Sequence, residues 1–164
     1  MKLLLTFLFF IIPTFSFSQT NETRQVSNAN HASFIMYHRF GDSRYPSTNI
    51  KKEQFMKHIK ELLKPKYDVI SIEKALTAIN YVEQIEDRSV VITIDDAYSS
   101  VYKYAWPIFK KYNLPFTLFI STDVIDNKTP GYMNWEQIRI LRDHGVTIWS
   151  QTKSHPHMFK LDKK

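Results

Sequence analysis

The stretch SVVITIDD, residues 89–96, decides the fold of this 164-residue chain. Between Ser89 and the two aspartates, every residue is apolar or β-branched. A run of this kind, without alternation of apolar and polar residues, is typical of a parallel strand buried on both faces of a sheet. Asp95 and Asp96 follow it directly, so the strand is expected to end in two neighbouring carboxylates.

Strands and helices are expected to alternate on both sides of this run. The other predicted strands cover residues 33–38, 67–70, 116–120 and 146–149, and the predicted helices cover 53–64, a segment that begins at 71, 99–112 and 134–144. This order indicates α/β architecture with parallel strands. Polar residues follow several strands, at His38, 95–96, 121–123 and 151–157. They should meet at one rim, because the carboxyl ends of parallel strands lie together.

Several residues carry local signals for helix ends. Asn134 with Gln137 three residues later predicts a capping box, and Gly145 fits the position just after that helix. Ser71 is a candidate N-cap, and Pro107 should kink its helix or mark a restart. The apolar side of the helix after Ser71 is expected to consist of Ala75, Leu76 and Ile79.

The N-terminus has the pattern of an export signal. Lys2 precedes a short apolar run, and the small residues Ser16 and Ser18 predict a cut before Gln19. Residues 1–18 are therefore predicted to be a signal peptide, and an uncleaved anchor is the alternative. The expected destination is the periplasm, the cell envelope or the exterior.

Composition narrows the class of protein. The sequence has no cysteine and three glycines, which excludes disulfide bracing and argues against a glycine-rich phosphate loop. Its net charge of +6 comes from scattered lysines, without a basic helix, so we expect no nucleic-acid partner. A solvated surface or attraction to anionic envelope material explains the charge. We predict a polar, flexible leader at 19–32, one domain at 33–164, and no stable membrane span after cleavage.

Two polar segments are candidates for chemistry. Asp95 and Asp96 could hold a metal and face a substrate water, or Asp96 could cap the next helix while Asp95 is solvated. His155 lies in a loop after another strand, and imidazole pairs well with carboxylate on zinc or cobalt. Its alternative is an exposed loop histidine.

Together, these segments resemble a known family. TIDDAYSS at 93–100 resembles the TFDDG block of the polysaccharide deacetylases (carbohydrate esterase family four, the NodB homology domain), and SQTKSHPHM at 150–158 resembles their SHTxxHP block. IMYHRF at 35–40 and the segment 104–120 are also similar to that family. The resemblance implies a distorted (β/α) barrel and a polysaccharide or oligosaccharide substrate.

The resemblance also implies roles for single residues. Asp95 falls on the general base, and Asp96 and His155 fall on ligands of a divalent metal. The resemblance implies zinc as this metal, with cobalt as the alternative. Gln151 stands where the family has a third ligand, histidine. It is a candidate metal ligand with a weaker amide oxygen, and the alternatives are a hydrogen bond to a bound water or loss of the metal site. Ala97 replaces the family's glycine, and we expect a φ below zero there.

The implied function is a metal-dependent hydrolase that removes N-acetyl or O-acetyl groups from an envelope or extracellular polysaccharide. The family's later blocks, which supply an arginine, an acetyl pocket and a histidine acid, do not follow residue 158, so the barrel is expected to be incomplete at its C-terminus. The alternative is therefore a non-catalytic glycan-binding or inactive truncated member. His38 could touch substrate or support the rim. Sugar stacking or packing is expected of Tyr132, Trp135 and Trp149.

Overall fold

The computed structural model describes residues 31–81, 83–157 and 159. The predicted signal peptide at 1–18 and most of the leader at 19–32 lie outside these residues. Within the described part, no helix is both long and apolar enough to cross a membrane.

The main sheet is parallel, and β5 (Ser89–Ile94) is its central strand. One edge of β5 pairs with β1 (Ala32–Tyr37) along its whole length. The other edge pairs first with β4 (Asp68–Ile70) and then with β6 (Thr117–Ile120). β7 (Thr147–Ser150) extends the sheet beyond β6. The α/β fold with a parallel sheet is thus confirmed, and the strand SVVITI occupies the position that its composition predicts.

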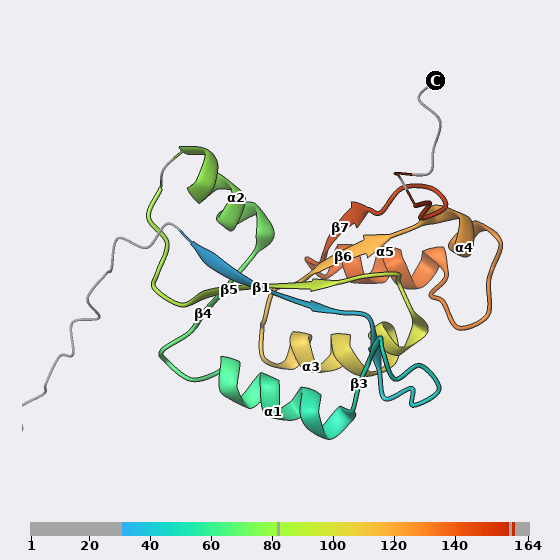
Figure 1. Cartoon of the computed structure of the whole chain (residues 1–164), viewed down its shortest axis with the longest axis horizontal. Coiled ribbons are helices and arrows are strands. Elements are labelled where there is room, and N and C mark those ends of the chain that lie inside the picture. Colours follow the sequence, from blue (N-terminus) through green and yellow to red (C-terminus); the bar gives the residue numbers. More distant parts are fainter. Residues whose placement is uncertain (1–30, 82, 158, 160–164) are drawn as a thin grey trace, which may run out of the picture.

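Helices connect these strands in the expected order (Figure 1). They are α1 (Lys52–Leu62), α2 (Ile72–Tyr81), the π-helical turn η1 (Val101–Ala105), α3 (Trp106–Lys111), α4 (Thr122–Asp126) and α5 (Trp135–Asp143). The two-residue strands β2 (Arg39–Phe40) and β3 (Asn49–Ile50) pair with each other outside the main sheet. Neither this pair nor α4 was expected, because elements of two to five residues leave little periodic signal.

β5 is buried throughout because each of its faces packs against a different core. Val90, Ile92 and Ile94 belong to the larger core, which also contains residues of α1, α3 and α5. Val91 belongs to a second core with residues of α2. Figure 1 shows α1 and α3 on one side of the sheet and α2 on the opposite side.

The face of the sheet that α2 covers is only partly buried. Phe34 and Met36 of β1 are 52% and 61% exposed. Phe119 of β6 and Trp149 of β7 pack beside the second core and are half-buried. Helices therefore cover one face of this sheet more completely than the other.

Most of the local signals for helix ends are confirmed. Asn134 and Gln137 form both hydrogen bonds of the capping box, and Gly145 has φ 84°. Ser71 Oγ accepts from the backbone of Lys74. Pro107 lies in the first turn of α3, directly after the π turn, as expected of a restart.

The predicted apolar side of α2 is partly wrong. Ala75 is buried, but Leu76 and Ile79 are exposed, and Ala78 is buried instead. The small side chains of Ala75 and Ala78 belong to the core that contains Val91 of β5. We attribute the burial of the alanines to close packing, because alanine lets a helix pack closer to a strand than leucine does.

The turn after β5 contradicts the expectation for Ala97. Asp96 and Ala97 have φ 70° and 48°, so both adopt the left-handed conformation. The turn is held on both sides, because Asp95 N–H donates to Tyr37 O at 2.9 Å and Met133 N–H donates to Ala97 O at 2.9 Å. The Ala97 side chain is fully buried, so its packing offsets part of a backbone cost of about 1–2 kcal/mol.

Replacing Ala97 with glycine should therefore leave stability unchanged or raise it. Loss of a buried methyl group is offset by relief of the left-handed strain. The control, Ala75→Gly, removes an equally buried methyl group from a helix and should cost about 1–2 kcal/mol, since glycine also lowers helix propensity. Urea unfolding measures both, and an equal loss in the two variants would contradict the role of the strained turn.

Candidate active site

The residues predicted to carry the chemistry gather at the carboxyl ends of the strands. Asp95 and Asp96 follow β5, and Gln151 and His155 follow β7. Sheet hydrogen bonding continues past both strand ends. Asp95 N–H donates to Tyr37 O at 2.9 Å, and Gln151 N–H donates to Ile120 O at 2.8 Å. The two segments are thus fixed at one rim although they are far apart in sequence.

Gln151 contacts Asp95 through its side chain. Its Nε2 donates a hydrogen bond to Asp95 Oδ2 at 3.2 Å. The opposite amide orientation would place oxygen against carboxylate oxygen, so this contact assigns the orientation of the amide. Gln151 Oε1 is then buried without a hydrogen-bond partner in the described part of the chain. Such an orphaned acceptor is costly unless a donor or a cation reaches it.

The environment of Asp95 raises the pKa of its carboxyl group. Burial is the largest cause, because it disfavours the charged form. The negative charge of Asp96 also raises this pKa. The charges of His38 and His155 and the hydrogen bond from Gln151 lower this pKa, each less strongly than burial raises it. A half-buried carboxylate with a raised pKa is suited to accept a proton.

Asp96 faces His155. Asp96 Oδ1 lies 4.0 Å from His155 Nδ1, and the side chains are 17% and 58% exposed. Both residues line a hollow of 320 Å³. We call it the carboxylate hollow, and its other lining residues are Tyr98, Ser121, Asp123, Val124, Tyr132 and Ser154. The two aspartates therefore have different partners, Gln151 for Asp95 and His155 for Asp96.

The loop that carries His155 is held in an unusual conformation. Thr152 and His155 have φ 66° and 49°. The loop is tied within itself by His155 N–H, which donates to Thr152 Oγ1 at 3.0 Å. It is tied to α4 by Asp123 N–H, which donates to Lys153 O at 3.0 Å. Strained residues that are held from several sides are typical of functional loops.

The donors present fit a divalent ion held by two side chains. Imidazole nitrogen and carboxylate oxygen bind zinc at about 2.0–2.2 Å, so two atoms 4.0 Å apart can reach one ion after a small approach. Within the described residues, no group of three or more His, Cys, Asp or Glu side chains gathers around a common point. The position where the resemblance implies a third ligand holds Gln151, whose orphaned Oε1 is a weaker neutral donor.

Of the four remaining candidates, His38 and Tyr132 lie near the site, and the two tryptophans have other contacts. His38 lies close enough to Asp95 to influence its pKa, and Tyr132 lines the carboxylate hollow. Trp135 instead donates to Asp126 at 2.7 Å, and Trp149 packs against Phe119 with ring centroids 5.8 Å apart.

Two residues that line the carboxylate hollow, Asp123 and Tyr98, were not predicted as site residues from the sequence. Asp123 was seen only as one polar residue after a strand, and Tyr98 was not singled out. The signal was available for both. Asp123 lies three residues after the end of β6, in the first turn of α4, and Tyr98 lies within the TIDDAYSS block.

Comparison with known proteins agrees with this geometry. The sequence model of the family described as polysaccharide deacetylase matches residues 83–164, which include both rim segments. The chain belongs to the polysaccharide deacetylase family. It is 29% identical over 121 residues to the Bacillus subtilis (strain 168) protein named "Putative polysaccharide deacetylase YxkH". That match covers 74% of this chain and 42% of YxkH.

Two solved structures are similar in fold to this chain. Streptococcus pyogenes deacetylase PplD, solved with acetate, aligns with TM-score 0.72 and 20% identity over 80% of this chain and 60% of PplD. IcaB from Ammonifex degensii aligns with TM-score 0.64 and 25% identity over 74% of this chain and 52% of IcaB. The chain thus spans about half the length of the proteins that it matches.

The charges around Asp95 predict how its pKa responds to substitution. Asp96→Asn should lower the pKa of Asp95, because a like charge is removed. His38→Gln should raise it, because a positive charge is removed at the acidic pH where Asp95 titrates. Carboxyl ¹³C NMR titration of the metal-free protein measures both shifts. Asp143→Asn, an exposed substitution on α5, is the control and should leave the pKa unchanged.

Proposed function

We propose that this protein is a metal-dependent hydrolase that removes acetyl groups, N-acetyl in the first place and O-acetyl as the second candidate, from a polysaccharide. The observation that carries the proposal is the placement of Asp95, with its raised pKa, beside the Asp96–His155 pair at one rim. Membership of the polysaccharide deacetylase family supports the substrate class.

In this proposal, each rim residue has a separate task. Asp95 takes the proton of a water molecule as that water attacks the acetyl carbonyl carbon. Gln151 holds the Asp95 carboxylate by donating to Oδ2. Asp96 and His155 hold a divalent ion, with zinc as the first candidate and cobalt as the second. When bound, such an ion supplies positive charge that polarises a carbonyl oxygen and acidifies water.

The hydrolysis balances without a further reactant. Water adds to the acetyl carbon, the bond from that carbon to nitrogen breaks, and the nitrogen takes a proton. The products are acetate and a free amine on the sugar, or an alcohol where an ester is cleaved. The predicted signal peptide at 1–18 supports an exported enzyme that acts on glycans of the envelope or the exterior.

A second candidate function is glycan binding without catalysis. Gln151 favours it, because an amide at a ligand position weakens zinc binding and its amide instead contacts Asp95. Retention of an N-acetylated glycan without release of acetate, in the presence of zinc or cobalt, would select this function.

Acetate release tests the role of Asp95. Asp95→Asn keeps the size of the side chain and removes the base, so we expect acetate release from N-acetylated oligosaccharides to fall by about 10²–10⁴-fold. In the unchanged protein, the rate should rise with pH as Asp95 loses its proton, at a pH above the ordinary range for aspartate because its pKa is raised. Asp143→Asn is the control. Unchanged acetate release in Asp95→Asn would contradict the assignment of Asp95 as the base.

Zinc titration tests the metal site separately. Gln151→His replaces a weak donor with imidazole and should raise zinc affinity about tenfold or more. Asp96→Ala and His155→Ala should each lower the affinity of the unchanged protein, since each removes one of two protein ligands. Isothermal titration calorimetry measures all three variants. Equal zinc affinity in Asp96→Ala, His155→Ala and the unchanged protein would exclude this site.

A further inference from the structure

A second hollow adjoins the carboxylate hollow. It measures 390 Å³ and shares Tyr98 and Tyr132 with its neighbour. We call it the tyrosine–arginine hollow, and its other lining residues are Arg39, Asp42, Arg44, Tyr45, Ser99, Ser100, Pro130 and Gly131. Tyr98 and Tyr132 therefore form the boundary between the residues proposed for catalysis and a space that those residues do not use. Their rings lie 4.7 Å apart at the centroids.

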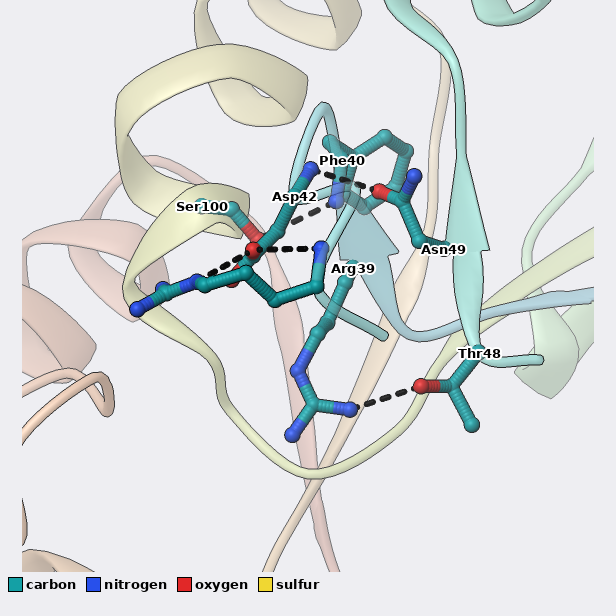
Figure 2. A network of polar contacts seen from close by, with 7 residues as sticks. Arg39, Phe40, Asp42, Thr48, Asn49 and Ser100 are labelled. Carbon is teal, nitrogen blue, oxygen red and sulfur yellow. Dashed lines mark hydrogen bonds and ion pairs between the residues drawn. The ribbon is translucent and has the colours of Figure 1, made fainter. Parts of the chain in front are cut away.

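Arg39 is held between two aromatic rings of this hollow. Its Cζ lies 3.5 Å from the ring centre of Tyr98 and 3.9 Å from that of Tyr45. Nη1 donates to Thr48 Oγ1 at 2.6 Å, as Figure 2 shows. A guanidinium group has five N–H donors in one plane. Within the described residues, the other guanidinium N–H groups of Arg39 have no acceptor, and no carboxylate forms an ion pair with this guanidinium.

The hollow contains two arginines and one carboxylate, so the charge of Arg39 is only partly compensated. Asp42, its only carboxylate, is bound by Arg44, whose Nε and Nη2 donate to Oδ1 and Oδ2 at 2.8 and 2.9 Å. This contact lowers the pKa of Asp42 and keeps it ionised. One positive charge therefore remains in excess, presented by a rigid planar group between tyrosine rings. Such a group is suited to carboxylate or phosphate oxygens.

The backbone around Arg39 is built to hold this arrangement. Arg39 N–H donates to Thr48 O at 3.0 Å, and Asp42 N–H donates to Asn49 Oδ1 at 2.8 Å. Phe40 N–H donates to Ser100 Oγ at 3.2 Å, which ties β2 to the segment after the Asp95–Asp96 turn. Figure 2 shows the contacts of Asp42 with Asn49 and of Phe40 with Ser100. These hydrogen bonds hold the hollow in shape without a ligand, and they fix its position relative to the rim.

We propose that the tyrosine–arginine hollow binds the sugar residue next to the acetylated one, and that Arg39 selects glycans with an acidic group at that position. The inference rests on the proposed function for the site of acetyl removal. Tyr98 is buried under Arg39, but Tyr45 is 45% exposed and Tyr132 is half-buried, so these two rings supply apolar surface for a sugar ring. The free guanidinium N–H groups of Arg39 supply donors for the anionic substituent of that sugar. The ligand class is an N-acetylated polysaccharide that carries a carboxylate or a phosphate.

Binding of matched oligosaccharides tests this selection. The full chain is titrated with chitotetraose, which is neutral, and with a hyaluronan tetrasaccharide, which alternates N-acetylglucosamine with glucuronate. We expect tighter binding of the acidic ligand at low salt, with a preference that declines as salt rises. Arg39→Gln should weaken acidic binding about tenfold and change neutral binding much less. Arg139→Gln, an exposed arginine of α5, is the matched control and should alter neither affinity.

Several outcomes would overturn the proposal. One is equal affinity for the two ligands in the unchanged protein. Another is an equal loss of both affinities in Arg39→Gln, which would show that the tyrosine sandwich only supports the fold. Arg39→Lys separates charge from shape, because it keeps the charge and loses the planar fork. We expect it to restore only part of the acidic preference, and thermal unfolding confirms that each variant is folded.

The binding assay is independent of turnover. Acetate release without a preference for the acidic ligand would contradict Arg39 selection and leave the hydrolase proposal standing. A preference that depends on Arg39, without acetate release, would support the subsite and contradict the hydrolase. Competition by glucuronic acid against glucose 6-phosphate shows which acidic group the hollow takes. If neither competes better than glucose, Arg39 does not bind anions and the proposal fails.

Discussion

Burial of β5 on both of its faces is the constraint on which the rest of this structure depends. Val91 packs into one core and Ile92 into the other, so a shift of the strand by one residue would exchange its two faces. β1 pairs with the whole of one edge, while β4 and β6 share the other. Only where these pairings end can polar side chains emerge. Asp95 is the first residue beyond them, and its backbone is still held by Tyr37.

The turn after β5 then separates two carboxylates that are neighbours in sequence. The left-handed residues Asp96 and Ala97 turn the chain sharply, and the loop at Met133 holds the turn in place. Asp95 is left half-buried beside Gln151, and Asp96 faces His155 across the carboxylate hollow. Burial raises the pKa of Asp95. Two identical side chains thus have different surroundings, which supports the separate roles proposed for them, Asp95 as proton acceptor and Asp96 as metal ligand.

Gln151 links the two sides of this rim. Its backbone continues the pairing of β6 and β7, and its amide donates to Asp95. An imidazole at this position could serve a metal, but the amide binds the carboxylate and leaves a buried oxygen without a partner. In the same region, Tyr98 and Tyr132 connect the carboxylate hollow with the hollow around Arg39. In the proposed function, the two adjoining hollows therefore suit a substrate longer than one sugar.

The sequence by itself determined the alternation of strands and helices along the chain, the parallel sheet and the capping box at Asn134. It also indicated that Asp95, Asp96, Gln151 and His155 follow strands and therefore lie at one rim. These features are local or follow from the rules of parallel sheets. The sequence also carried the family resemblance. Only the tertiary structure decided the left-handed turn at Ala97, the exposed side of Leu76 and the placement of Arg39 between Tyr45 and Tyr98. These features depend on packing between segments distant in sequence, and no local pattern of residues encodes such contacts.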